Sequence, residues 1–237
     1  MLIRQLFDQK SCTYTYLLAD EESREAVLID TVVEKLDDYH RLVQELDLKL
    51  LYTLETHTHA DHITAAGDIR EQLGAASLVG RQSLANCVSA TFEHGDEITF
   101  GQHKLKVIYT PGHTDDSYSF FIPGPQAMLF SGDTLLIRGT GRTDFQGGDA
   151  RRQYHSLQSE ILVLPEDTLV YPGHDYKGWS VSTIGEERRC NPRLLLGSED
   201  AYIAHMSELN LPNPKMMDVA VPANQQCGKR PFVDPGF

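Results

Sequence analysis

The chain has 237 residues, of which 41% are hydrophobic and 23% are charged, a composition typical of folded globular proteins and not of disordered ones. Its 21 basic and 34 acidic residues give a formal net charge of −13, which argues against a nucleic acid or an anionic membrane surface as a partner. Runs of apolar residues are short throughout the chain, so no segment is predicted to span a membrane.

The first third of the chain alternates between strand and helix patterns. Apolar stretches predict strands at 2–7, 13–19, 26–29 and 48–54. Apolar residues at helical spacing predict one helix over 34–47 and a second over 63–73, which Gly74 would end as a C-cap. This alternation is typical of an α/β protein.

The remainder of the chain begins with a run of short strands, after which helices return. The predicted elements are strands near 76–79, 97–100, 103–110, 117–122 and 126–130, a helix over 149–164, a strand at 168–171 and two short helices within 185–208. The run from 97 to 130 leaves no room for crossover helices, which favours mixed sheets with helices packed outside. We expect a single domain over 1–237, with C-terminal helices and an ordered tail from about residue 180. The part from 210 on is rich in Pro, Asn and Gly and is predicted to be ordered loop.

The cysteines and the N-terminal residues indicate the compartment. The four cysteines are scattered and form no Cys-x-x-Cys pair, so we expect free thiols in a reducing compartment. The first residues show neither the long apolar stretch of a signal peptide nor the Arg- and Ser-rich pattern of a transit peptide. We therefore expect a cytoplasmic protein.

A dense group of polar side chains follows the strand predicted at 48–54. Residues 56–62 read Thr-His-Thr-His-Ala-Asp-His. In extended backbone, residues two apart point to the same face, so His57 and His59 should project together. Asp61 and His62 then lie where the chain turns into the next helix. Four imidazole or carboxylate groups within six residues indicate a metal-ligand cluster.

Three further segments each place one metal-ligand residue just after a predicted strand. His113 follows 103–110, Asp133 follows 126–130 and His174 follows 168–171, each beside a glycine that allows a sharp turn. Each signal is weak alone, because such turns are common at protein surfaces. If these strand ends share one edge of a sheet sandwich, seven candidate ligands converge on one site.

This pattern resembles the metallo-β-lactamase superfamily over roughly residues 10 to 180. The resemblance implies a four-layer αββα sandwich with its metals at one edge. Seven ligands could hold two Zn²⁺ ions and activate a bridging water, as in a binuclear zinc glutathione thioesterase of the glyoxalase II type. That branch usually has a third histidine where this chain has Thr58, and a longer helical region after the residue that matches His174.

Four other stretches resemble a different branch, the persulfide dioxygenase (ethylmalonic encephalopathy protein-like) family. They are 135–146, 173–176, 210–214 and 221–228, and with them the resemblance covers about residues 2–232. The resemblance implies oxidation of glutathione persulfide by O₂ to glutathione and sulfite, a step of sulfur metabolism and hydrogen sulfide oxidation, and a homodimer.

The same resemblance implies one Fe(II) per chain, bound by the residues matching His57, His113 and Asp133. Two histidines and one carboxylate leave open positions, as a non-heme iron oxygenase needs. The other four candidate ligands would then orient these three and water through hydrogen bonds: His59, Asp61, His62 and His174. The sequence offers no reason why these four groups would not bind a second metal.

The substrate's charge suggests two further residues. Glutathione brings two carboxylates to an acidic protein, so Arg142 is expected to bind a carboxylate or to shape the site. Tyr176, two residues after His174, is expected to hydrogen-bond substrate. The zinc thioesterase and a non-catalytic metal-binding or sulfur-carrier module remain as alternatives, while the charge balance disfavours a nuclease of the superfamily.

Overall fold

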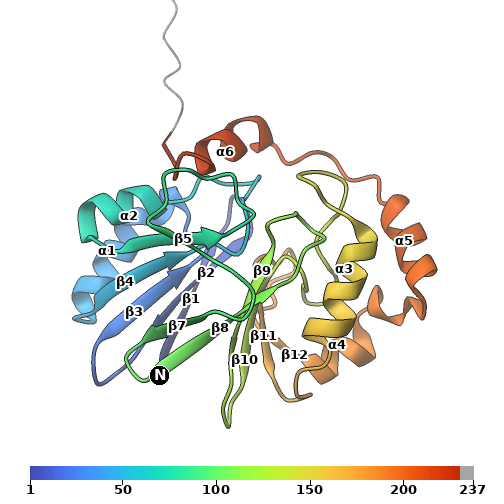
Figure 1. The fold of residues 1–237 in the computed structure, drawn as a ribbon, viewed down its shortest axis with the longest axis horizontal. Helices are drawn as coiled ribbons and strands as arrows, with labels where there is room; N and C mark the ends of the chain where they lie inside the picture. The colour runs from blue at the N-terminus through green and yellow to red at the C-terminus, as the bar shows by residue number, and fades with distance from the viewer. Residues whose placement is uncertain (230–237) are drawn as a thin grey trace, which may run out of the picture.

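The computed structural model describes residues 1–229 and consists of two six-stranded mixed sheets packed face to face (Figure 1). The first sheet has the order β1-β2-β3-β4-β5-β6, formed by Leu2–Asp8, Thr13–Ala19, Glu25–Ile29, Lys49–Leu54, Ala76–Gly80 and Ala90–Phe92. The second sheet has the order β12-β11-β10-β9-β8-β7. Its strands, listed from β7 to β12, are Glu97–Phe100, His103–Tyr109, Tyr118–Ile122, Met128–Gly132, Leu169–Pro172 and Ser182–Thr183.

Helices cover the outer face of each sheet. Against the first sheet lie α1 (Leu36–Glu45) and α2 (Ala66–Leu73), and against the second lie α3 (Ala150–Ser156), α4 (Ile184–Cys190) and α5 (Glu199–Ser207). Apolar side chains fill the space between the sheets and the space beneath both helical layers. The predicted four-layer αββα sandwich is therefore confirmed.

Parallel pairing aligns strand ends where the polar segments begin. Ile29 of β3 pairs with Leu54 of β4, so the residues that follow both strands leave the sheet side by side. In the second sheet, Gly132 of β10 pairs with Pro172 of β11 in the same way. This register brings segments that are distant in sequence to one edge of the sandwich.

The C-terminal segment differs from the predicted loop. Residues Met217–Asn224 form the helix α6, which lies above the edge of the first sheet in Figure 1. Ala220 and Ala223 are buried against Ile63, and this packing outweighs the low helix propensity of Pro222. The last part of the predicted tail, 230–237, lies outside the described residues.

The expectation of free thiols is wrong for two of the four cysteines. Cys87 and Cys227 form a disulfide across 140 residues of sequence, with their Cα atoms 5.9 Å apart. The packing of the α6 segment beside the loop that carries Cys87 brings the two cysteines together. No local sequence motif predicts a pair so far apart in the chain. Cys12 and Cys190 are free. Among residues 1–229, no helix has both the length and the apolar character needed to cross a membrane.

Candidate metal centre

Loops from both sheets bring the candidate ligands to one edge of the sandwich. His57 follows β4, His113 follows β8, Asp133 follows β10 and His174 follows β11, as the sequence predicts. All four side chains are buried. The strand-end positions therefore do converge on one site.

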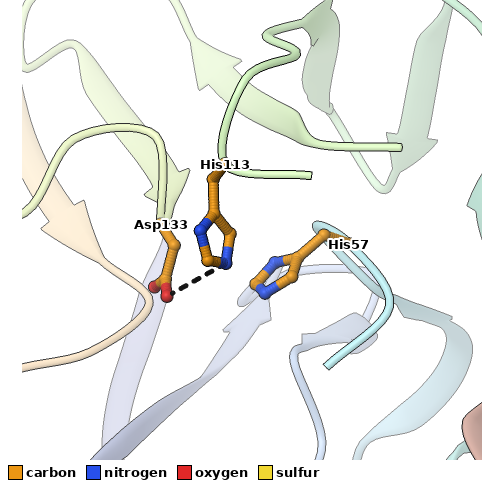
Figure 2. A group of neighbouring side chains, drawn as sticks. All are labelled: His57, His113 and Asp133. Carbon is orange, nitrogen blue, oxygen red and sulfur yellow. Dashed lines mark ion pairs between the residues drawn. The ribbon is translucent and has the colours of Figure 1, made fainter. Parts of the chain in front are cut away.

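Three of these side chains form a group that could hold a metal ion. One ligand atom each of His57, His113 and Asp133 lies within 4.8 Å of the others. Figure 2 shows the two rings and the carboxylate turned toward a common centre, with His113 Nε2 3.5 Å from Asp133 Oδ2. Two imidazoles and one carboxylate on one side of an ion suit a non-heme Fe(II) site that keeps open positions.

Hydrogen bonds determine which ring nitrogen His57 and His113 can each offer to a metal ion. The Thr56 hydroxyl donates to Asp30 Oδ2 at 2.8 Å, so it accepts from His57 Nδ1 at 2.9 Å. The carbonyl of Arg142 can only accept, so His113 Nδ1 donates to it at 2.7 Å. Both rings therefore carry their proton on Nδ1 and present a bare Nε2, the state in which imidazole ligates a metal.

Glycines allow the close approach of loops around Asp133. The Gly141 amide donates to the Asp133 carbonyl at 2.6 Å, and a Cβ on Gly141 would lie 2.6 Å from His113 Nδ1. A Cβ on Gly173 would lie 2.8 Å from Asp133 Oδ1. Because real Cβ contacts are longer than these, each position needs a glycine, which gives a physical reason for two glycines of the stretches singled out in the sequence.

Charge inside the site keeps Asp133 ionised and His57 neutral. Burial alone would raise the pKa of Asp133, but the charge and hydrogen bond of His174, whose Nδ1 lies 2.7 Å from Asp133 Oδ1, hold this pKa well below its usual range. Burial lowers the pKa of His57, and the neighbouring His59 and His113 lower it further. These are the protonation states that metal binding requires.

The other four candidates lie around this group; Asp61 bonds to His62 and His174, whereas His59 faces two other carboxylates. His59 Nε2 lies 3.1 Å from Asp30 Oδ1 and 3.3 Å from Glu55 Oε2. Burial would lower the pKa of His59, but these carboxylates raise it well above its usual value. Asp61 Oδ2 joins two rings, at 2.9 Å from His174 Nε2 and 3.0 Å from His62 Nδ1. Asp30 and Glu55 were not singled out in the sequence, although each directly follows a strand.

A residue of α6 holds the histidine segment in place. Asn224 Nδ2 donates to the carbonyls of His59 and His62, both at 2.9 Å, and its Oδ1 accepts from the Thr64 amide at 2.8 Å. The sequence gives no local signal for this role, because Asn224 stands 160 residues from Thr64.

A cavity of 330 Å³ opens beside the three ligands, within the range of small-molecule pockets, roughly 300–1,000 Å³. Both predicted substrate residues line it. The Arg142 guanidinium makes two 2.6 Å bonds to Asp144 and bonds to the carbonyls of Leu211 and Pro212, so it fastens the 211–212 segment to the pocket wall. Tyr176 is 71% exposed, and its ring stacks on that of His174 with the ring centroids 6.1 Å apart.

Two other cations of the pocket wall have no carboxylate partner among the described residues. Arg193 is partly buried and donates to the carbonyl and hydroxyl of Thr140, while Lys177 lies over the ring of Trp179. Arg138, by contrast, is paired with two glutamates. Arg193 was missed in the sequence, where nothing distinguishes it from a surface arginine.

Comparison with known proteins agrees with this geometry. Residues 13–87 and 88–174 match the sequence profile of the metallo-beta-lactamase superfamily. The mitochondrial persulfide dioxygenase ETHE1 of Mus musculus is 52% identical over 229 residues, 96% of this chain and 89% of the mouse protein. The crystal structure of ETHE1 from Myxococcus xanthus is 51% identical, with a TM-score of 0.93 over 97% of this chain and 100% of that chain. TTHA1623, solved in a di-iron-bound form, is 28% identical, with a TM-score of 0.66 over 80% of this chain and 98% of that chain.

The fold and the strand-end ligands thus define the class of the protein: the chain belongs to the metallo-beta-lactamase superfamily. Half of its residues are identical to those of ETHE1 proteins over nearly the whole chain. Within the superfamily it is therefore a member of the persulfide dioxygenase family.

Proposed function

We propose that the protein is a persulfide dioxygenase that uses one Fe(II) per chain to oxidise glutathione persulfide. Glutathione persulfide, O₂ and water give glutathione, sulfite and two protons. The outer sulfur loses four electrons and O₂ gains four, so the reaction balances without another reductant. The observation that carries the proposal is the group of His57, His113 and Asp133 that lines a cavity, in a chain half identical to named persulfide dioxygenases.

The three proposed ligands supply two neutral donors and one negative charge. His57, His113 and Asp133 would hold Fe(II) with open positions, and the bound iron would let electrons pass from the sulfur to O₂ with no net change in its own oxidation state. The protein's own part is to hold the persulfide beside that position, which makes the reaction effectively unimolecular. The hydrogen bonds of Thr56 and the Arg142 carbonyl keep both imidazoles in the orientation and tautomer that this arrangement needs.

We propose that glutathione lies in the 330 Å³ cavity with its carboxylates toward cations that are not already paired. Arg193 and Lys177 meet that condition, and a carboxylate between them would also compensate the burial of Arg193. We assign Arg142 chiefly to shaping the pocket, because Asp144 already occupies its guanidinium. Tyr176, exposed beside His174, is proposed to hydrogen-bond the substrate.

An oxygen electrode tests this function on the anaerobically iron-loaded protein. Fresh glutathione persulfide should cause O₂ uptake with one sulfite formed per O₂ consumed. Absence of uptake from protein with full iron content would refute the proposal and leave the non-catalytic metal-binding module.

The binuclear zinc thioesterase is not favoured by the curated half-identical relatives, which are named persulfide dioxygenases. S-acyl glutathione hydrolysis by the zinc-loaded protein is its test, and we expect none above background. The homodimer and the cytoplasmic location stay predictions; the mouse relative is named as mitochondrial.

A further inference from the structure

A tight turn at residues 136–139 forms one wall of the cavity beside the proposed iron ligands, and all four of its residues line that cavity. Leu136 and Gly139 each donate an amide hydrogen bond to the other's carbonyl, at 3.0 and 3.2 Å, so Ile137 and Arg138 form the tip of the turn. Arg138 has a φ of +58° at the second central position, where glycine is usual. A side chain such as arginine keeps this backbone conformation only when surrounding contacts hold it.

A buried carboxylate of α4 holds this turn. Glu187 has 0% exposure, and each of its two oxygens accepts two hydrogen bonds. Oε2 accepts from the Arg138 amide at 2.8 Å, and Oε1 accepts from the Arg138 guanidinium. The other two bonds come from the Ser182 hydroxyl at 2.6 Å and from Asn191 Nδ2 at 2.9 Å. This set of bonds compensates the burial of the carboxylate and fixes the backbone and the side chain of Arg138 together.

Asn191, which follows α4, holds the turn from a second side. Its Nδ2 lies 3.0 and 3.3 Å from the carbonyls at the two ends of the turn. Its Oδ1 accepts from the Arg193 amide at 3.1 Å, and the Arg193 guanidinium donates to the carbonyl and hydroxyl of Thr140, the residue after the turn. Glu187 and Asn191 therefore hold both the wall of the cavity and the cation assigned above to a substrate carboxylate.

This pair of residues lies behind the wall of the cavity. Glu187 and Asn191 are both fully buried, and the residues that line the cavity include the turn and Arg193 but not the pair itself. The pair can therefore act on a substrate only through the groups that it holds. The side chains of the three proposed iron ligands have other partners: Thr56, the Arg142 carbonyl and His174. A change in the pair should therefore alter substrate binding and leave the iron site intact.

We propose that Glu187 and Asn191 are positioning residues for substrate recognition, which place the wall turn and Arg193 where the carboxylate-bearing tail of the persulfide binds. The inference rests on the dioxygenase function proposed above and deepens it by naming the residues that prepare the cavity for this tail. The sequence has no local signal for the pair, because Glu187 stands 49 residues from Arg138.

Steady-state O₂ uptake by the iron-loaded protein with glutathione persulfide tests the inference. Glu187→Gln keeps the size of the side chain but replaces one acceptor oxygen with an NH₂ donor. We expect KM to rise about tenfold while kcat and iron content stay within about twofold of the wild type, because the reacting centre is untouched. An unchanged KM would overturn the inference, as would a fall in kcat or a loss of iron at unchanged KM.

Glu186→Gln is the matched control. Glu186 lies on the same helix and pairs with the Arg138 guanidinium, whereas the Arg138 amide bonds to Glu187. The control removes the same charge beside the same arginine, so it should leave KM within about twofold of the wild type. Equal effects of the two variants would assign the result to charge alone and overturn the inference.

A double-mutant cycle tests whether the pair acts through Arg193. In an Arg193→Ala background, Glu187→Gln should raise KM by a smaller factor than it does in the wild type, because the group that it positions is already gone. The same factor in both backgrounds would contradict this link. A merely structural role of Glu187 would give that second result.

Two further measurements cover the cases in which a variant does not fold or the protein consumes no O₂. By hydrogen exchange and mass spectrometry, the wild-type segment 136–139 should exchange slowly, and exchange at the rate of an exposed loop would overturn the inference even if Glu187→Gln does not fold. Anaerobic calorimetry with glutathione separates the inference from the proposed function. Weaker binding by Glu187→Gln supports the inference even if the wild type consumes no O₂, whereas O₂ uptake with equal glutathione binding by both proteins would overturn the inference and leave the function standing.

Discussion

Replacing Asn224 with alanine tests whether α6 positions the metal-binding segment. The change removes three buried hydrogen bonds, two to the carbonyls of His59 and His62 and one from the Thr64 amide. At about 1 kcal/mol each, their loss should lower the free energy of unfolding by about 3 kcal/mol. For a chain of this size, that corresponds to a fall in Tm of roughly 6–12 °C. The affinity for iron should fall by about tenfold or more, because the backbone segment that carries the proposed ligand His57 loses its hydrogen bonds to Asn224.

Urea unfolding and competition with a graded iron chelator measure the two effects on the same preparation. Asn210→Ala is the matched control, because Asn210 is an exposed asparagine of the same C-terminal region. It should change neither value. An Asn224→Ala protein with the stability and iron affinity of the wild type would refute the positioning role.

Three further changes test other parts of the site. Asp133→Ala should lose iron and dioxygenase activity together, since one of three protein ligands is gone; iron retained in this variant would disprove the ligand set. Arg193→Ala should raise the KM for glutathione persulfide about tenfold at unchanged iron content, because the substrate carboxylate loses its partner. The control Arg189→Ala changes an exposed arginine and should leave the KM unchanged. If Arg193→Ala has the KM of the wild type in O₂-uptake assays, Arg193 is not part of the binding site. Cys227→Ser should lower the free energy of unfolding in urea by about 2–5 kcal/mol, and the free-thiol control Cys190→Ser should not; equal stability would count against the disulfide.

The positions of the metal-ligand candidates could be predicted because they depend on local pattern. His57, His113, Asp133 and His174 each follow a recognisable apolar strand, and strands of one sandwich end at a shared edge. The pattern could not divide the seven candidates into ligands and supporting groups. The division that we propose depends on hydrogen bonds such as the one from Thr56 to Asp30, which join different loops.

Long-range packing decides the features that the sequence did not predict. The segment 217–224 reads as loop because of its proline, yet burial of Ala220 and Ala223 makes it a helix. The partner of Cys87 lies 140 residues away, and no spacing rule connects the two. The short strands β6 and β12 were also missed, since three and two residues give too little pattern for a prediction.

Metal content and O₂ uptake, measured on one purified sample loaded with graded amounts of iron, test the central claim most directly. We predict that the rate of O₂ uptake with glutathione persulfide rises in proportion to bound iron and reaches its maximum near one iron per chain. A sample that holds two zinc ions per chain, hydrolyses S-acyl glutathione and consumes no O₂ when iron replaces the zinc would contradict it.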